Sequence, residues 1–499
     1  MTSADFPFIY FSIITKDQKF TKPCSKIHFC HCSKIICQLS FREVICAGFH
    51  GFTGKQRTTM EKIAVIGAGI AGLVCADHLS RKGMEVSVFE RSPQIGGRAQ
   101  TVKENGFTID LGAQFFFSNY HRTRDLVDRL YLKSSTVRIN DPFAFLRHGR
   151  VYPFSPYFLK VNPGSFWLLG FDALDWRQRA SLSRLIFWLG TGGRSVGVES
   201  RDGGYAFDGI DLRSFFEERF GATLYRDFVS PLVQTVSFQE PTHLSAMTGI
   251  LRLRGAMKGL WSTMGGAGYL ATNLRREIKR VLPRHAVVGI EPDGDSMVIR
   301  FEDDREPQRF DRVIVATDAE HARTLLAQNG GEGIPTLPYQ PAVVVNQALD
   351  SRPEKIRNRF AIIPHPMEAR PFRFVINSYS RFVGSVPPGC TCLQWFLTGD
   401  QALAAAEKSD AELIDLIEHQ AHGMFPDMRK PLFNKVVRWQ RAVVQQKPGH
   451  LAIIKSLPKK IGDRIYLAGS YMRGGGIEAA VISGKDAALS VLDDLTAGR

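Results

Sequence analysis

A glycine-rich hexapeptide directly after a short apolar run has the residue types and spacing of a phosphate-binding turn. The apolar run occupies residues 63–66, and the sequence GAGIAG follows at 67–72 as a GxGxxG pattern. The first glycine of such a turn permits a tight bend, the second lets a pyrophosphate approach the backbone, and the third lets the next helix pack closely on the strand. The pattern predicts a dinucleotide site whose turn contains Gly67, Ala68, Gly69, Ala71 and Gly72.

An acidic residue follows this turn at the distance expected of a ribose ligand. The run VSVF at 86–89 predicts a second strand, and Glu90 ends it. A carboxylate in this place accepts hydrogen bonds from ribose hydroxyls and repels a 2′-phosphate. Residues 70 to about 82 predict a helix stopped by Gly83, so the segment forms a βαβ unit. The alternative, an ordinary βαβ unit with incidental glycines, leaves the position of Glu90 unexplained.

A second phosphate-binding pattern lies a few residues beyond Glu90. Arg91 follows Glu90 directly, and Gly96 and Gly97 precede Arg98. Paired glycines expose backbone amides to a phosphate, and an arginine adds a fixed positive charge nearby. A glycine turn with a solvated arginine is the alternative, and the spacing from Glu90 argues against it.

This arrangement of an acid followed by Gly-Gly-Arg resembles the second signature of FAD enzymes in the superfamily of monoamine oxidases, phytoene desaturases and protoporphyrinogen oxidases. Four further stretches resemble the same superfamily, so that the likeness covers most of residues 60–499. They are 106–112, 286–290, 313–317 and a closing motif at 464–484. The resemblance implies FAD contacts at Gly112, Ala113, Val287, Ala316, Thr317, Gly469, Ser470 and Ile477. It also implies noncovalent FAD, because relatives with covalent flavin use a cysteine shortly before the closing motif and residues 440–470 contain none.

The closing motif has its own physical meaning. The glycines at 474–476 precede a predicted helix that begins near Ile477. Its free N–H groups and positive dipole end would face the flavin pyrimidine carbonyl and stabilise negative charge on reduced flavin. Ser470 is a departure, because relatives often carry Asp, Glu or Asn there, and a hydroxyl binds the ribityl chain more weakly than a carboxylate.

The elements that must position these motifs predict an α/β protein. We expect a discontinuous Rossmann-like FAD-binding domain from residues 60–113, 265–320 and 460–499. Residues 114–264 and 321–459 are expected to form an inserted α+β substrate domain with a helical subregion. One of its helices is predicted after the Asp211 cap, with Gly221 as its stop.

Segments of this substrate domain resemble bacterial protoporphyrinogen oxidases and related desaturases more than amine oxidases. They are 230–232, 240–245, 439–442 and 447–450. The resemblance implies transfer of a hydride to FAD from a hydrophobic substrate such as a tetrapyrrole or isoprenoid, with oxygen or another acceptor reoxidising the flavin. A flavin amine oxidase and a non-redox FAD-dependent isomerase are the alternatives. No catalytic residue is assigned, and the conceivable bases are His243, His285, Tyr379, His450 and Tyr471.

The first 59 residues differ in composition from the rest of the chain. They hold five of the eight cysteines but no clean pair of CxxC motifs, and eight of the 64 basic residues. We expect a disordered leader or an over-extended reading frame that precedes a true start at Met60, with a zinc module as the alternative. We expect no metal site in the remainder.

The net charge of +15 indicates an anionic partner. The basic residues are scattered and no nucleic-acid motif occurs, so nucleic acid is not expected. Residues 153–190 are rich in aromatic residues with interspersed Lys and Arg, which predicts contact with an anionic membrane surface. A helical substrate domain with an aromatic core is the alternative. The expected location is the cytoplasm, with peripheral attachment to the inner face of the membrane if that contact exists.

Overall fold

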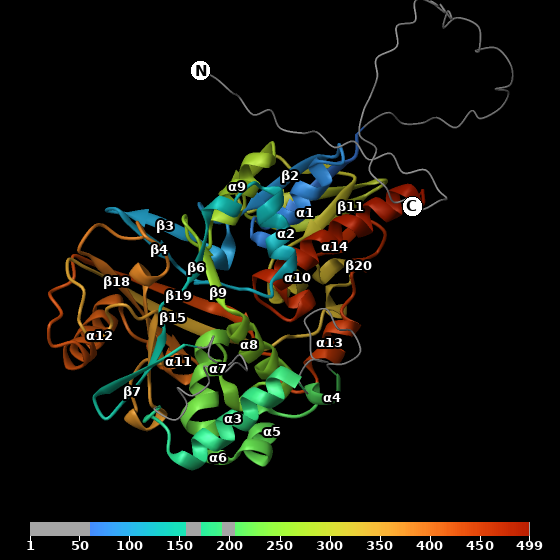
Figure 1. Ribbon diagram of the computed structural model, residues 1–499. Coiled ribbons are helices and arrows are strands. Elements are labelled where there is room, and N and C mark those ends of the chain that lie inside the picture. The colour runs from blue at the N-terminus through green and yellow to red at the C-terminus, as the bar shows by residue number, and fades with distance from the viewer. Residues whose placement is uncertain (1–59, 156–170, 192–204, 499) are drawn as a thin grey trace, which may run out of the picture. The chain divides into compact units, whose positions relative to one another are not determined.

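The computed structural model describes residues 60–155, 171–191 and 205–498. The predicted leader and the aromatic run 166–169 lie outside these ranges. Within them the fold is the predicted mixed α/β architecture, with a largely parallel sheet, a larger antiparallel sheet and a group of helices (Figure 1).

The parallel sheet contains the predicted phosphate-binding strands. Its order is β10-β2-β1-β14-β21-β20, and all neighbours are parallel except β20 and β21. Three stretches far apart in the sequence therefore meet in one sheet. The strands are β1 (Lys62–Ile66), β2 (Glu85–Glu90), β10 (Arg280–Pro283), β14 (Arg312–Val315), β20 (Lys460–Ile461) and β21 (Ile465–Leu467).

Two helices pack together beside this sheet, and glycines allow their close approach. They are α1 (Ile70–Ser80), which ends two residues before the predicted position, and α14 (Ile477–Thr496), which begins at the predicted residue. A Cβ on Gly484 of α14 would overlap the carbonyl oxygen of Ala71 in α1, so only glycine permits this contact. Figure 1 shows the two helices side by side.

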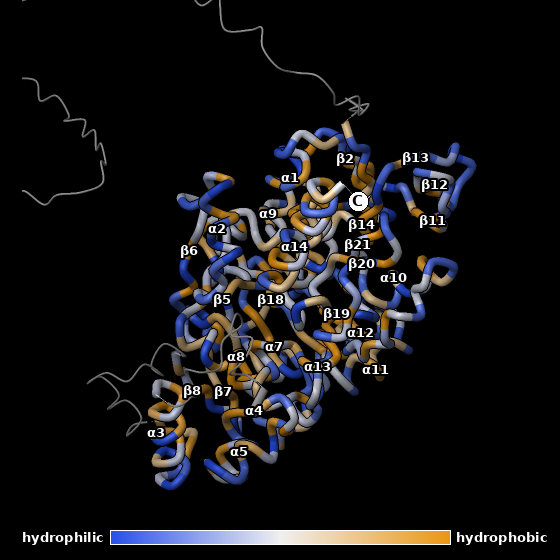
Figure 2. Tube along the Cα trace, turned by 90° about the vertical axis from the view of Figure 1, so that its right-hand side faces the viewer, coloured by the Kyte–Doolittle hydropathy of each residue, from blue (hydrophilic) through white to orange (hydrophobic). Residues whose placement is uncertain are grey.

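The larger sheet runs in the order β19-β15-β18-β17-β16-β7-β8, and only β16 and β7 are parallel. Its central strand β18 is entirely buried, and helices α11 (Asp400–Ala406) and α12 (Asp410–Met424) pack against it and its neighbours. Figure 2 shows hydrophobic residues along β18 in the interior. The strands are β7 (Phe143–Arg147), β8 (Arg150–Phe154), β15 (Tyr339–Leu349), β16 (Ala361–Pro364), β17 (Phe374–Asn377), β18 (Thr391–Thr398) and β19 (Phe433–Val444).

A group of helices lies along the chain between strands of the two sheets. The predicted helix after Asp211 is confirmed, because the Asp211 side chain accepts a hydrogen bond from the Ser214 amide and Gly221 ends the helix. The group contains α3 (Trp176–Thr191), α5 (Leu212–Phe220), α7 (Ser230–Ser237) and α8 (Ala246–Lys258). No helix in the described ranges is both long and apolar enough to cross a bilayer.

A buried ion pair joins the segment before Gly112 to the larger sheet. The guanidinium of Arg381 contacts the carboxylate of Asp110, the last residue of β4 (Phe107–Asp110), and neither side chain is exposed. Gln394 of β18 also donates a hydrogen bond of 2.8 Å to the carbonyl oxygen of Asp110. Removing one partner of a buried pair leaves an uncompensated charge, so this contact holds the two parts in one arrangement.

Candidate cofactor and substrate site

One cavity of about 790 Å³ lies where the carboxyl ends of the parallel strands face β19 and the helices α7, α8 and α14. Residues that the sequence placed in six separate motifs line it together. They are Gly67, Gly69, Ala71, Glu90, Arg91, Gly97, Arg98, Gly112, Ala113, Val287, Ala316, Thr317, Gly469, Ser470 and Ile477.

Two predicted residues, Ala68 and Gly72, do not line the cavity but contribute to the structure of the glycine turn. The amide of Ala68 donates a hydrogen bond of 2.8 Å to one carboxylate oxygen of Glu90, so Glu90 ties the glycine turn to the end of β2. A Cβ on Gly72 would overlap the carbonyl oxygen of Gly67, so Gly72 serves helix packing. The Gly69 backbone, by contrast, is open, since a Cβ there would meet nothing within 4 Å.

Arg98 is held at the cavity wall by groups from two distant segments. It donates hydrogen bonds of 3.1 Å to the Ser470 hydroxyl and 3.2 Å to the Ala442 carbonyl. Ser470, the residue that departs from the pattern of relatives, thus orients an arginine. A neutral partner leaves the positive charge of Arg98 available to a phosphate.

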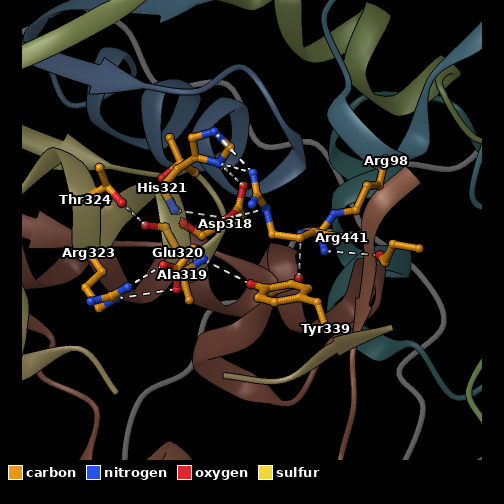
Figure 3. Close-up of polar contacts among 12 residues, drawn as sticks. Arg98, Asp318, Ala319, Glu320, His321, Arg323, Thr324, Tyr339 and Arg441 are labelled. Atoms are coloured by element: carbon orange, nitrogen blue, oxygen red, sulfur yellow. Dashed lines mark hydrogen bonds and ion pairs between the residues drawn. The ribbon is translucent and has the colours of Figure 1, made fainter. Parts of the chain in front are cut away.

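A histidine and a carboxylate orient two further arginines at the same wall, and Figure 3 shows one of them, Arg441, beside Asp318 and His321. Asp318 caps helix α10 (Ala319–Leu325) by accepting a hydrogen bond from the His321 amide. Its other oxygen lies 2.5 Å from Nδ1 of His321, and Nε of Arg441 lies 3.1 Å from the carboxylate. Nη1 of Arg91 lies 2.7 Å from Nε2 of His321. Nη2 of Arg441 also lies 2.9 Å from Nδ1 of His321, so the imidazole contacts both arginines and the carboxylate.

The electrostatics of this cluster favour an ionised Asp318. Burial alone would raise the pKa of Asp318, but hydrogen bonds from His321 and the charge of Arg441 lower it to about 2. The cluster was missed by sequence reasoning. Asp318 follows Thr317 as a visible helix cap, and Arg441 lies in the stretch 439–442, but nothing in their spacing shows that they meet.

The opening of α14 lies at the cavity as the sequence predicted. Gly474, Gly475 and Gly476 have φ values of 94°, 103° and 88°, which side chains other than glycine rarely adopt, and the helix begins at Ile477. Glu478 in its first turn is buried and accepts hydrogen bonds from the backbone amides of Arg122 and Thr123. Glu478 therefore caps helix α2 (His121–Arg129).

The part of the cavity beside this helix opening is aromatic, and we call it the aromatic end. Phe238, the left-handed residue after α7, contacts the rings of Phe115 and Phe396, and Phe115 contacts Phe117. Polar groups here are few. They are Tyr120, Ser237, Gln239 and Arg252. We call the opposite part, which contains Glu90, Arg91, Arg98, Asp318, His321 and Arg441, the phosphate end.

None of the conceivable bases lies at the aromatic end. His285 lines the cavity, but its amide donates to the carbonyl of Glu90, so it belongs to the phosphate end. Tyr471 is fully buried in a hydrophobic cluster behind Gly469 and is not part of the lining. His243, Tyr379 and His450 do not line the cavity either.

Comparison with known proteins identifies the protein family. The model of the flavin-containing amine oxidoreductase family matches residues 70–492, so the chain belongs to this family of FAD-dependent oxidoreductases. The predicted resemblance is confirmed, and so is the predicted fold class.

Particular relatives are distant. The chain is 21% identical to coproporphyrinogen III oxidase of Bacillus subtilis, over 86% of this chain and 97% of the relative. It is 20% identical to protoporphyrinogen oxidase 2 of Arabidopsis thaliana, over 87% and 94%. It is 25% identical to rat prenylcysteine oxidase 1 but spans only half of that protein's length. The fold matches putrescine oxidase with a TM-score of 0.67 at 15% identity, over 87% of this chain and 99% of that one.

Proposed function

We propose that the chain holds one noncovalent FAD along the cavity and oxidises or desaturates a hydrophobic small molecule at the aromatic end. The observation that supports this most is the continuity of one cavity from the glycine turn and Glu90 to the phenylalanine cluster beside α14. The open backbone of Gly69 and the left-handed glycines before α14 are features that a tightly held cofactor requires.

The residues divide the work between the two ends. Glu90 has the position to bind ribose, while the open backbone of Gly69 and the positive charge of Arg98 suit a phosphate. The free amides at the start of α14 would favour negative charge on the ring system beside them. Bound FAD supplies the hydride acceptor. The rings of Phe115, Phe238 and Phe396 exclude water and position an apolar substrate.

A tetrapyrrole-like substrate is the class that the relatives favour. Coproporphyrinogen III oxidase and protoporphyrinogen oxidase 2 match nearly the whole chain. The amine oxidases share the fold, but an ammonium group at the aromatic end would meet the positive charge of Arg252 and the positive end of α14. Oxygen or another acceptor would take up the electrons.

Anaerobic photometry with the purified holoenzyme tests this proposal. We expect coproporphyrinogen III to bleach the flavin absorption band, and a primary amine such as putrescine to leave it unchanged. If the protein is a desaturase, a polyene precursor should bleach the flavin band instead. Bleaching by the amine alone, or turnover of any substrate without bleaching or acceptor, would refute the proposal in favour of an amine oxidase or a non-redox isomerase.

We also propose that helix α3 contacts an anionic membrane surface. Its inner face is buried through Leu182, Leu185 and Ile186. Its outer face exposes Trp176 by 70% and Phe187 by 63%, and the helix contains three arginines and no acidic residue. Figure 2 shows hydrophilic and hydrophobic residues mixed along α3. Exposed aromatics among cations suit the headgroup layer of an anionic bilayer.

Flotation with vesicles of phosphatidylglycerol and phosphatidylcholine tests this contact. We expect the protein to float with the anionic vesicles, and W176A/F187A to lose most of that binding. Tyr131→Ala is the matched control, because it removes another ring that is 91% exposed. Equal flotation of the double variant and wild type, or none by wild type, would refute the contact.

A further inference from the structure

Arg252 places a positive charge at the aromatic end, where the other described lining residues are uncharged. It lies on α8 at the boundary between the cavity and a side pocket of about 50 Å³. Its Nη1 donates a hydrogen bond of 3.1 Å to the hydroxyl of Tyr120, and its guanidinium carbon lies 5.9 Å from the centre of the Phe117 ring. The surroundings of this charge are thus mainly aromatic.

The charge of Arg252 has no anionic partner in the described part of the chain. Its Nε is buried and has no hydrogen-bond partner there, and no carboxylate of the described residues forms an ion pair with it. Tyr120 does not compensate for the charge, because burial raises the pKa of its phenol and keeps it neutral. A charged group at an apolar wall is costly unless an opposite charge meets it.

The other arginines of the cavity are bound differently. Arg441 pairs with Asp318, and Arg438 pairs with Asp410. Arg91 is held by His321 and Arg98 by Ser470. Among these side chains Arg252 is the one that combines an aromatic setting with a single neutral partner, the Tyr120 hydroxyl.

The opening of α14 adds to the positive potential at Arg252. A Cβ on Gly476 would lie 3.8 and 3.9 Å from the two terminal nitrogens of Arg252, so the guanidinium lies against the start of the helix. Glu478 lines the same side pocket, but its carboxylate accepts hydrogen bonds from the amides of Arg122 and Thr123 and forms no ion pair with Arg252. A guanidinium beside a helix N-terminus is a strong site for a carboxylate.

We infer that Arg252 binds a carboxylate carried by the apolar substrate and so determines which hydrophobic molecules enter the aromatic end. This inference rests on the proposed function for the location of the substrate. It predicts that the preferred substrates are hydrophobic acids, and that their neutral esters bind much more weakly.

Paired probes test the inference in the FAD-loaded protein. The pairs are coproporphyrin III with its tetramethyl ester, and retinoic acid with methyl retinoate. Binding of each probe is measured from the change that it causes in the flavin spectrum. We expect wild type to bind each acid at least about tenfold more tightly than its ester. R252Q should reduce this preference to less than about twofold, while R252K should retain part of it because the charge remains.

Two further measurements separate carboxylate binding by Arg252 from a general effect of positive charge and from an effect on the flavin. Lys258→Gln removes an exposed positive charge from the same helix and should leave the acid preference intact. The reduction potential of the flavin is measured in R252Q and wild type together with the acid preference, because the guanidinium lies against the helix opening proposed to face the flavin. A shifted potential with an unchanged acid preference would show that Arg252 acts on the flavin, which overturns the inference.

The outcomes separate the inference from the proposed function. The inference is refuted if wild type binds acid and ester equally, or if R252Q keeps the acid preference. If R252Q loses the preference while coproporphyrinogen III, polyene and amine all fail to bleach the flavin, the proposed oxidation is refuted and the anion site stands.

Discussion

The phosphate end and the aromatic end of the cavity differ in how the protein treats charge. At the phosphate end, Asp318 and His321 hold Arg91 and Arg441 before any ligand binds, and Ser470 holds Arg98. At the aromatic end, Arg252 has one neutral partner, the Tyr120 hydroxyl, and no carboxylate partner among the described residues. The difference indicates that the protein itself orients the arginines that would bind the cofactor. The arginine that would select the substrate lacks a charged protein partner, so the substrate would supply the opposite charge.

Of the substitutions that test the two ends, Gly72→Ala is expected to have the largest effect, a loss of FAD affinity at the phosphate end. The added Cβ would overlap the carbonyl of Gly67 and separate α1 from the glycine turn. We expect FAD affinity to fall at least about 100-fold and unfolding free energy to fall by about 3 kcal/mol. Fluorescence titration of the apoprotein and urea unfolding measure these quantities. Gly209→Ala is the control, because a Cβ there meets nothing within 4 Å; equal losses in both variants would contradict a specific role of the turn.

The next effect concerns the carboxylate of the phosphate end. Asp318→Asn leaves Arg441 without its ion pair, and we expect FAD to bind about tenfold more weakly. Because the folded pKa of Asp318 is about 2 and its ordinary value is 3.8, the carboxylate contributes about 2 kcal/mol of stability above pH 4. This contribution is lost as the pH falls from about 4 to 2.

Urea unfolding of apo wild type and D318N along this pH range measures the contribution. The difference between the two proteins should be largest near neutral pH and should shrink toward pH 2. A pH-independent difference would mean that Asp318 acts by packing rather than by charge. If D318N binds FAD as tightly as wild type, the ion pair of Arg441 does not prepare the phosphate end for the cofactor, and the proposed difference between the two ends is contradicted.

A smaller and more selective effect is expected at the aromatic end. Phe238→Ala removes a ring that contacts Phe115 and Phe396. We expect the KM for a hydrophobic substrate to rise about fivefold to tenfold, with FAD affinity unchanged, because the ring packs at the substrate part of the cavity. Steady-state kinetics and flavin titration measure the two quantities. A loss of FAD affinity equal to the rise in KM would show that the two ends do not act separately.

The smallest effect is expected from Ser470→Ala. It removes one neutral hydrogen-bond partner of Arg98, which retains the Ala442 carbonyl. Such a bond contributes about 1 kcal/mol, so FAD should bind about fivefold more weakly. Ser470→Thr keeps a hydroxyl and should restore most of the affinity in the same titration. A loss as large as that of Asp318→Asn would contradict the ranking.

Local patterns in the sequence predicted the parts of the fold that depend on near neighbours. The strand before Gly67, the helix that begins at Ile477 and the Asp211 cap all occur as expected, because backbone sterics and capping bonds act within a few residues. The helix boundary at Ser80 was less accurate, since the last turn depends on what it packs against.

The amino-acid sequence is sufficient to identify a GxGxxG turn, a ribose-binding acid and a helix opened by glycines, because these motifs combine residue type with short spacing. The three-dimensional arrangement was needed to show that Asp318 and His321 orient Arg441, that Tyr471 is buried behind the cavity, and that Arg252 faces it. These contacts join residues far apart along the chain, and packing of whole sheets and helices, rather than any local preference, brings them together.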